Sequence, residues 1–302
     1  FPGAAWEGIR MGHRPGDALV EIWNGMPFLS PIWYRGPRIV FLHHVHAEMW
    51  GMVLPPTLAR LGYATERRLA PPLYRHSHIV TLSESSRDEI VELLGLHPDR
   101  ISVAPPGVDG RYTPGGHRSP VPLVLAVGRL VKVKRFDDLL RALAEVKAEQ
   151  PELRAVIIGE GIERNSLEAL RAELGAEDWI DMPGHIEDDE LVWWYRRAWV
   201  VASSSQREGW GMTLTEAAAC GTPAVATSIA GHRDAVLDGE SGLLVDGVEG
   251  LGPALARVLR DDVLRSRLSK GALARARWFT WDATARRALE ALAGQMAPLP
   301  DR

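Results

Sequence analysis

Two carboxylates, Glu208 and Glu216, flank a glycine turn and are the side chains of this sequence best spaced to hold a polyhydroxylated ligand. Residues 199–203 have the pattern of a buried strand and residues 212–220 that of a helix, so the glycines lie on a strand-to-helix turn. Glu208 at the strand end and Glu216 one turn into the helix are placed to accept hydrogen bonds from hydroxyl groups. The alternative is that Glu208 is solvated and Glu216 balances the helix dipole, and this pattern by itself does not decide between the two.

The backbone of the same turn suits a phosphate group. Unpaired N–H groups at the start of a helix carry roughly half a positive charge, and glycines let a ligand approach the main chain closely. The residues expected to contribute are Gly209, Gly211, Met212, Thr213 and Leu214.

Two cations, Arg129 and Lys134, follow a predicted strand at 123–127. Cations aimed into a closed cleft stabilise the charge that develops on a leaving phosphate without a metal. Removing one such group typically costs on the order of 3 kcal/mol at the transition state. The alternative is a solvated basic loop.

Three histidines, His43, His44 and His46, come at the end of a predicted strand at 38–42. Strand alternation puts His44 and His46 on one face and His43 on the other, where a packing role is expected for it. Zinc binding is the rival use of imidazoles. No cysteine or compact carboxylate set completes such a site, so we expect no metal.

The elements that position these residues alternate between strand and helix, which predicts parallel sheets with right-handed crossovers. Strands are predicted at 18–23, 38–42, 78–82, 101–104, 123–127, 154–158, 179–182 and 199–203, and helices at 136–150, 164–174, 189–198, 212–220 and 282–292. A linker at 112–122, rich in Gly and Pro, places a domain boundary after residue 116. Ligands of such sheets bind beyond the carboxyl ends of the strands, where Gly128, Gly159 and Glu208 fall.

The composition is that of an ordinary globular enzyme. The chain has 302 residues, of which 46% are hydrophobic and 25% charged, and its net charge of −4 gives no reason to invoke nucleic acid. Its one cysteine, Cys220, is expected to be a small packed thiol and excludes an intrachain disulfide framework. No apolar run approaches the roughly 20 residues that span a bilayer, so a soluble protein is expected, and the single cysteine suits the reducing cytoplasm.

One segment leaves a membrane role open. Residues 60–75 mix arginines with leucines, as do helices that lie on anionic membranes, including the inner membrane surface. The alternative is an ordinary amphipathic helix with a solvated face, interrupted by Pro71 and Pro72.

Several separate motifs follow one another in a fixed order and spacing. They are Val127-Gly128-Arg129-Leu130, Lys134, Ile158-Gly159-Glu160-Gly161, Pro183-Gly184-His185, the run 219–226, Ala230-Gly231 and Gly242-Leu243-Leu244-Val245. With the turn between Glu208 and Glu216, this arrangement resembles the donor-binding half of the family-four retaining glycosyltransferases. The resemblance is strong over about residues 121–246 and extends more weakly to both ends.

The resemblance implies the α/β GT-B architecture, in which two doubly wound Rossmann-like domains face a central cleft. Residues 1–116 would form the acceptor-side domain and residues 117–280 the donor-binding domain, with the terminal helix at 281–302 packing back on the first domain. The family also implies an earlier strand, glycine-rich loop and helix, and a longer join at 11–16. We therefore expect an incomplete N-terminal domain.

The resemblance also implies a function. A hexose-type sugar would pass, with retention, from a UDP- or GDP-linked donor to an acceptor hydroxyl of a glycan, a lipid-linked molecule or a small molecule, with no cofactor. The implied catalytic residues are His44, Glu208, Arg129 and Lys134. The implied donor-binding residues are Gly128, Arg129, Lys134, Gly159, His185, Ile186, Glu208, Gly209, Gly211, Met212, Thr213, Leu214 and Glu216.

Departures and rival functions accompany this interpretation. Ala230 replaces a glycine usual in the family, and Asp234 stands where the family often has Glu, which puts the shape of the sugar pocket in doubt. The rivals are a nucleotide-sugar-binding fragment without turnover, a GT-B epimerase or phosphorylase, and a structural scaffold.

Overall fold

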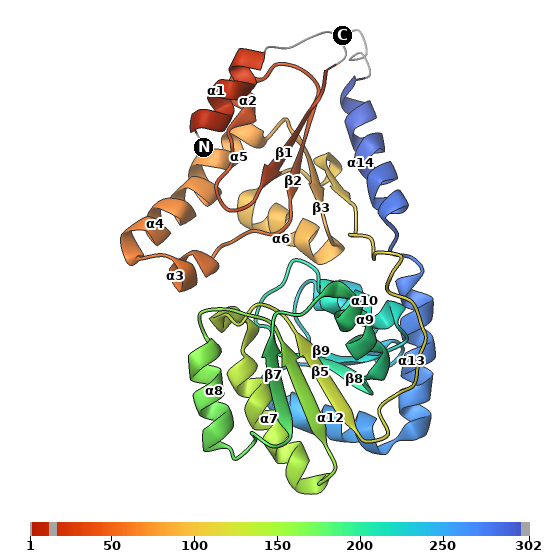
Figure 1. Ribbon diagram of the computed structural model, residues 1–302. Helices are drawn as coiled ribbons and strands as arrows, with labels where there is room; N and C mark the ends of the chain where they lie inside the picture. The colour runs from red at the N-terminus through yellow and green to blue at the C-terminus, as the bar shows by residue number, and fades with distance from the viewer. Residues whose placement is uncertain (1, 12–16, 297–302) are drawn as a thin grey trace. The chain divides into compact units, whose positions relative to one another are not determined.

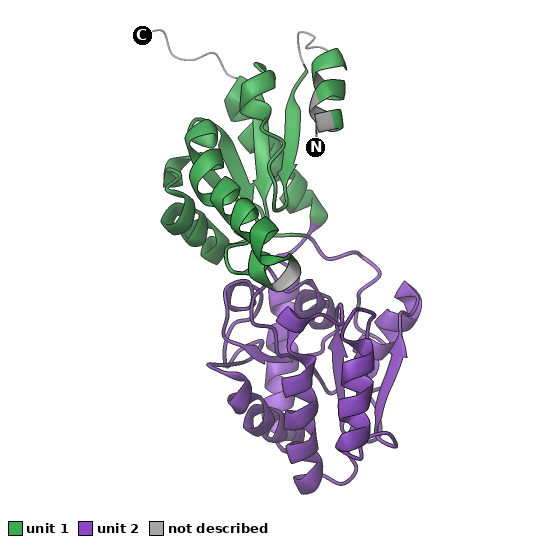
Figure 2. Cartoon of the chain, turned by 90° about the vertical axis from the view of Figure 1, so that its left-hand side faces the viewer, with its two compact units in different colours: residues 1–106, 281–302 green, residues 107–280 purple. Residues whose placement is uncertain are grey.

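The computed structural model describes residues 2–11 and 17–296, and the chain divides into two compact units (Figures 1 and 2). Unit 1 consists of residues 1–106 with 281–302, and unit 2 of residues 107–280. The join at 11–16, where the sequence predicts an omission, falls on residues 12–16, which lie outside the described residues.

Unit 1 is built on a parallel sheet of four strands in the order β1-β2-β3-β4. The strands are β1 (Leu19–Trp23), β2 (Arg38–Leu42), β3 (His78–Thr81) and β4 (Ile101–Val103), and the helices are α1 (Pro2–Met11), α2 (Ser30–Trp33), α3 (Met49–Val53), α4 (Pro56–Ala64), α5 (Ala70–Tyr74) and α6 (Glu84–Leu94). One face of the sheet packs on Tyr74 of α5 and Ile90 of α6.

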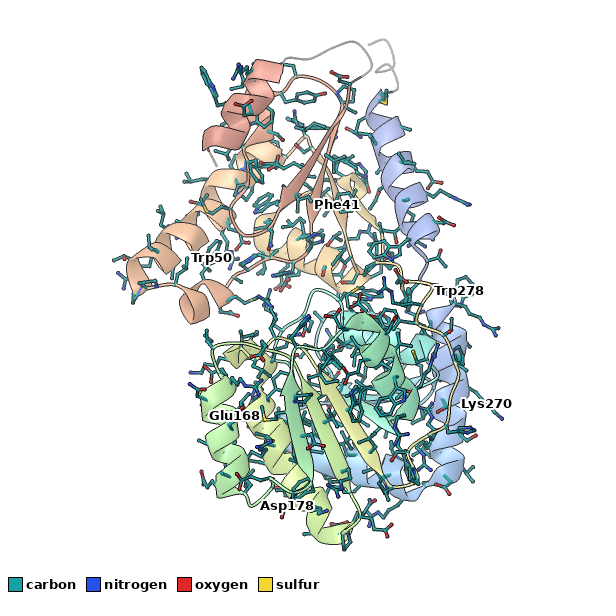
Figure 3. All side chains as sticks on the ribbon, in the orientation of Figure 1. Phe41, Trp50, Glu168, Asp178, Lys270 and Trp278 are labelled. Carbon is teal, nitrogen blue, oxygen red and sulfur yellow. The ribbon has the colours of Figure 1, made fainter. Side chains whose placement is uncertain are left out.

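The last helix, α14 (Trp281–Met296), covers the opposite face of the unit 1 sheet. Ala291 packs against Ile39 and Val80, with Phe41 of β2 partly buried beside them (Figure 3). The Thr284 hydroxyl donates a hydrogen bond to the Pro105 carbonyl at 2.6 Å. The chain therefore returns from unit 2 to complete the unit 1 core.

The prediction that Pro71 and Pro72 interrupt the helix at 60–75 is wrong. Helix α4 continues through a π-helical turn, Thr65–Leu69, directly into α5. The Ala70 N–H donates to the carbonyl of Thr65, five residues back, rather than four. The wider turn accommodates two prolines that lack an N–H and whose rings would clash with carbonyls of a regular α-helix.

Unit 2 is a doubly wound parallel sheet of six strands in the order β10-β9-β8-β5-β6-β7. The strands are β5 (Leu123–Val127), β6 (Arg154–Ile158), β7 (Ile180–Gly184), β8 (Val200–Ser203), β9 (Ala224–Thr227) and β10 (Gly242–Val245), and the helices are α7 (Phe136–Glu149), α8 (Arg164–Glu173), α9 (Asp188–Arg197), α10 (Met212–Ala219), α11 (His232–Ala235), α12 (Leu251–Arg260) and α13 (Asp262–Ala276). From β5 the chain winds outward through β6 and β7, then returns to the other side of β5 at β8. The order reverses between β5 and β8, and such a switch point is where these sheets bind ligands.

The boundary between the units lies after Pro106, not after residue 116. The Val108 N–H donates to the Phe279 carbonyl at 3.0 Å, and Arg196 Nε donates to the Thr113 carbonyl at 2.8 Å. These contacts bind residues 108–113, including the start of the Gly- and Pro-rich linker, to unit 2. The hydrogen bonds of this segment therefore locate the boundary better than its composition does.

Candidate functional site

The candidate site lies at the carboxyl edge of the unit 2 sheet. Gly128 and Arg129 follow β5, and the loop from Ser204 to Glu208 follows β8, the neighbouring strand at the switch point. The sequence predicts these positions at strand ends, and the strand bounds confirm it. Residues far apart in the chain therefore share one edge because parallel strands all end there.

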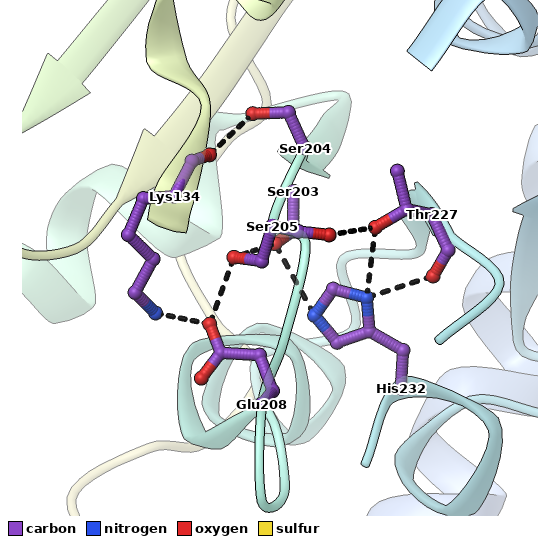
Figure 4. A network of polar contacts seen from close by, with 7 residues as sticks. All are labelled: Lys134, Ser203, Ser204, Ser205, Glu208, Thr227 and His232. Atoms are coloured by element: carbon purple, nitrogen blue, oxygen red, sulfur yellow. Dashed lines mark hydrogen bonds and ion pairs between the residues drawn. The ribbon is translucent and has the colours of Figure 1, made fainter. Parts of the chain in front are cut away.

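Lys134 and Glu208 form an ion pair at this edge (Figure 4). Lys134 ends a 3₁₀ turn after β5, and the Ser204 hydroxyl holds that turn by donating to the Lys134 carbonyl at 2.8 Å. The Ser205 hydroxyl donates to Glu208 Oε1 at 2.8 Å. Burial raises the pKa of Glu208, but the Lys134 charge and the hydrogen bonds from Lys134 and Ser205 outweigh it and hold this pKa below the usual range. Glu208 is therefore a carboxylate.

A buried histidine, His232, lies beside this pair (Figure 4). Its Nδ1 is 2.8 Å from the Thr227 carbonyl, which can only accept, so Nδ1 carries the proton. Its Nε2 is 3.3 Å from the Ser203 hydroxyl. Burial lowers the pKa of His232 despite the nearby Glu208, so the ring is neutral at pH 7.

The start of α10 is left open to a ligand. Gly211 precedes it with a φ of 129°, and no side chain caps the helix. The first amides of a helix have no intrahelical partner, so those of Met212 and Thr213 are available. The backbone of Gly231 packs closely against this turn. A Cβ atom at Gly231 would lie 2.7 Å from the Glu208 carbonyl oxygen, so a side chain does not fit there.

Glu216 lies within α10 and accepts a hydrogen bond from the Tyr195 hydroxyl of α9 at 2.9 Å. Burial raises the pKa of Glu216, and Asp188 adds to this, while the Tyr195 hydrogen bond opposes it. Glu216 is thus a half-buried carboxyl group whose pKa is raised by burial, and the Tyr195 hydrogen bond partly offsets this rise.

Gly128 and Gly159, at the ends of neighbouring strands, differ in whether the protein has room for a side chain at their position. At Gly159, whose φ is 144°, a Cβ would lie 1.9 Å from the Gly128 carbonyl oxygen, so the protein's own backbone excludes a side chain. At Gly128 a Cβ would meet nothing closer than 3.6 Å, the Lys134 Cε and the Phe136 ring. The protein alone therefore leaves space for a methyl group at Gly128.

Three other residues that were predicted to bind the donor, Arg129, His185 and Ile186, are at least partly exposed. Arg129 is exposed and its side chain has no hydrogen bond or ion pair with any residue that the structure describes. His185 is exposed and Ile186 half-buried in the loop after β7.

His44 lies in unit 1, in the loop after β2. Its ring stacks on His46 at 4.7 Å, while His43 lies against Phe41, which confirms the predicted alternation. The fully buried Glu66 holds this loop in place, because its carboxylate accepts hydrogen bonds from the His46 and Ala47 N–H groups and from Trp50 Nε1.

The described ranges also bear on groups of metal-ligating side chains and on the environment of the one thiol. Across residues 2–11 and 17–296, no group of three or more His, Cys, Asp or Glu side chains is arranged to hold a metal ion. Cys220 is buried, and burial raises the pKa of its thiol to about 11, so it is a packed thiol as predicted. In the same described part of the chain, no helix is both long and apolar enough to span a membrane.

Three contributors to the site, Ser205, Tyr195 and His232, were not predicted from the sequence. Ser205 carries a signal, because it lies three residues before Glu208 on the same loop. His232 follows the Ala230-Gly231 motif, which marks a turn at a strand end. Tyr195 carries no such signal, since its face of α9 is revealed only by packing.

Family comparisons agree with this geometry. Residues 114–275 match the model for "Glycosyl transferases group 1", and residues 18–111 match that for "Glycosyltransferase Family 4". A D-inositol 3-phosphate glycosyltransferase of Xylanimonas cellulosilytica is 35% identical over 349 aligned positions, covering 100% of this chain and 82% of the relative. Its counterpart in Frankia alni is 36% identical, but the match covers 74% of this chain and only 60% of that relative. The chain thus spans about three fifths of the length of some of its curated relatives.

Solved structures show the same fold. Sucrose-phosphate synthase from Thermosynechococcus elongatus superposes with a TM-score of 0.83 at 20% identity, covering 99% of this chain and 78% of that one. The Anabaena protein HepE in complex with UDP and glucose gives 0.79 at 19% identity, covering 97% and 82%. The fold is therefore GT-B, as predicted, and the chain belongs to the family of group 1 glycosyl transferases.

Proposed function

We propose that unit 2 binds a nucleoside diphosphate sugar and that the chain transfers the sugar, with retention, to an acceptor hydroxyl. The observation that carries this proposal is the Lys134–Glu208 pair at the switch point, beside the uncapped start of α10. A cation and a carboxylate at one sheet edge match the phosphate and hydroxyl halves of such a donor.

The diphosphate is held by Lys134, Arg129 and the first amides of α10. Arg129 has no partner among the described residues, so its guanidinium is available to a phosphate. The space beside Gly128 leaves room for the ligand next to Lys134. As the bond to the sugar breaks, these groups stabilise the negative charge that develops on the leaving diphosphate. We therefore expect turnover without a metal ion.

Glu208 and Glu216 accept hydrogen bonds from the hydroxyl groups of the donor. Glu208 Oε1 is occupied by Lys134 and Ser205, and the carboxylate accepts from the transferred sugar through its remaining lone pairs. Glu216 accepts from the ribose, and the backbone at His185 and Ile186 contacts the base. Gly159 shapes the sheet edge and does not contact the ligand, because the Gly128 carbonyl oxygen leaves no room for a side chain at this position.

Retention follows from attack on the face that the diphosphate leaves. The sugar carbon passes through an oxocarbenium-like state, and the departing phosphate oxygen accepts the proton of the acceptor hydroxyl. Glu208 stays ionised in its ion pair with Lys134, and this pairing makes the carboxylate a weak nucleophile. The role of His44 at the reacting carbon rests on the family resemblance alone.

The names of similar proteins indicate which donor and which acceptor to test first. HepE was solved with UDP and glucose, which makes UDP-glucose the first donor. The name shared by the curated relatives makes D-inositol 3-phosphate the first acceptor.

The test is nucleotide release by the purified chain with both substrates, in buffer containing a metal chelator, followed by NMR of the product's anomeric proton. We expect turnover and an anomeric configuration equal to the donor's. Lys134→Gln should lower kcat by about 10²–10³-fold, whereas Lys132→Gln, an exposed lysine of the same turn, should not. An inverted product, or equal rates for the two variants, would refute the mechanism. Binding without turnover would favour the nucleotide-sugar-binding alternative.

A further inference from the structure

Unit 2 has a cavity of about 480 Å³ at the end of its sheet where the strands begin, opposite the candidate site. Ser119, which precedes β5, and Trp199, which precedes β8, line it, as do Cys220 and Gly221 after the end of α10. None of its lining residues belongs to the predicted donor site. The volume is within the range of small-molecule sites.

Three arginines converge on this cavity, with Asp262 as the one carboxylate in its lining. Arg196 donates to the Thr113 carbonyl and hydroxyl, both at 2.8 Å. Arg118 donates to carbonyls that include those of Ala198 and Gly221. These partners are neutral oxygens, so they satisfy hydrogen bonds without cancelling the two positive charges.

The third arginine, Arg265, pairs with Asp262 and lies 4.0 Å above the Trp199 ring. Burial lowers the pKa of Arg118, Cys220 raises it, and the charge of Arg265 lowers it, so the two guanidinium groups repel each other. Cys220 adds no negative charge, since burial raises the pKa of its thiol to about 11. An excess of positive charge in a concave site is relieved by an anion.

We propose that this cavity binds a small phosphate-bearing molecule. Guanidinium groups offer paired N–H donors that match phosphate oxygens, and the hydroxyls of Ser266 and Ser269 on α13 line the same cavity as further donors. The phosphate lies among Arg118, Arg196 and Arg265, and the rest of the cavity accommodates the group that carries it.

The experiment is calorimetric titration of the full chain with inorganic phosphate and, separately, with glucose 6-phosphate. Ser269→Asp places a carboxylate in the cavity while keeping every arginine, and Arg196→Gln removes one guanidinium. Each should weaken binding about tenfold or more. Tighter binding of glucose 6-phosphate identifies a phosphate ester as the ligand, and equal affinity identifies phosphate itself.

Two matched variants make the outcome decisive. Arg267→Gln removes an exposed charge from the same helix outside the cavity and should leave the affinity unchanged. Lys134→Gln alters the candidate donor site, so binding that survives this substitution is not binding at the donor site. The proposal is overturned if neither anion binds, if Ser269→Asp and Arg196→Gln bind like the original chain, or if Lys134→Gln is the variant that loses binding.

Discussion

At the scale of single residues, the site combines groups whose charges depend on one another. Lys134 and Ser205 keep Glu208 ionised, while burial works against ionisation of Glu216. A donor's ribose needs an acceptor, so on our proposal it binds the ionised form of Glu216. Nucleotide affinity is thus linked to the proton affinity of one carboxyl group.

Nucleotide binding should weaken as the pH falls through the raised pKa of Glu216, above the ordinary value of 4.5. Tyr195→Phe removes the hydrogen bond that lowers this pKa, so in the variant the loss should begin at a higher pH. Calorimetric titration of UDP at successive pH values measures both profiles. Coincident profiles would show that Glu216 does not govern binding.

At the scale of elements, the ends of β5 and β6 position the site through two glycines with opposite constraints. Gly159→Ala forces a methyl group against the Gly128 carbonyl, so it should lower the free energy of unfolding by about 3 kcal/mol. Gly128→Ala fits the protein's own atoms and should unfold like the original chain, yet bind UDP much more weakly. Urea unfolding and calorimetry separate the two effects. A stable Gly128→Ala variant with unchanged UDP affinity would contradict the placement of the donor beside Gly128.

The π-helical turn has a structural consequence of its own, because it carries Glu66 under the His44 loop. Glu66→Gln replaces an acceptor oxygen with an NH₂ group facing N–H donors, which should cost about 1–3 kcal/mol. Hydrogen exchange of residues 43–50 should rise, and Glu92→Gln, an exposed carboxylate of α6, serves as the control. Unchanged exchange in Glu66→Gln would refute its positioning role.

Glu66 also predicts a pH dependence. Burial raises its pKa, but hydrogen bonds from His46, Trp50 and Ala47 lower it to a net value below 4.5. Its contribution to stability is therefore present above the unfolded pKa and lost as the pH falls through the folded one. The original chain should lose more stability on acidification than Glu66→Gln does.

Local features of the sequence predicted the elements well. The strands at 123–127 and 154–158 and the turn at Gly209 and Gly211 follow from short-range patterns, and the structure confirms them. The contacts of Tyr195 and His232 depend on how α9 and α11 pack, which no local pattern encodes. The continuous helix through Pro71 was also missed, because a π turn offsets a proline effect that is reliable in regular helices.

At the scale of the whole molecule, the chain crosses between its units twice, after Pro106 and after Thr280. The core of unit 2 is built from its own strands and helices, whereas unit 1 needs α14 over Ile39 and Val80. A chain ending at Thr280 should therefore keep a folded unit 2 and lose hydrogen-exchange protection in β2 and β3. Equal protection with and without α14 would show that unit 1 does not depend on it.

The most direct test of the account is calorimetric titration of the full chain with UDP, GDP and ADP in a metal chelator. It should be repeated on Lys134→Gln, Glu216→Ala and the control Lys132→Gln. We predict selective binding of one nucleotide that is weakened in Lys134→Gln and Glu216→Ala and preserved in Lys132→Gln. Equal affinity in all four proteins, or no binding of any nucleotide, would contradict a donor site at the switch point of unit 2.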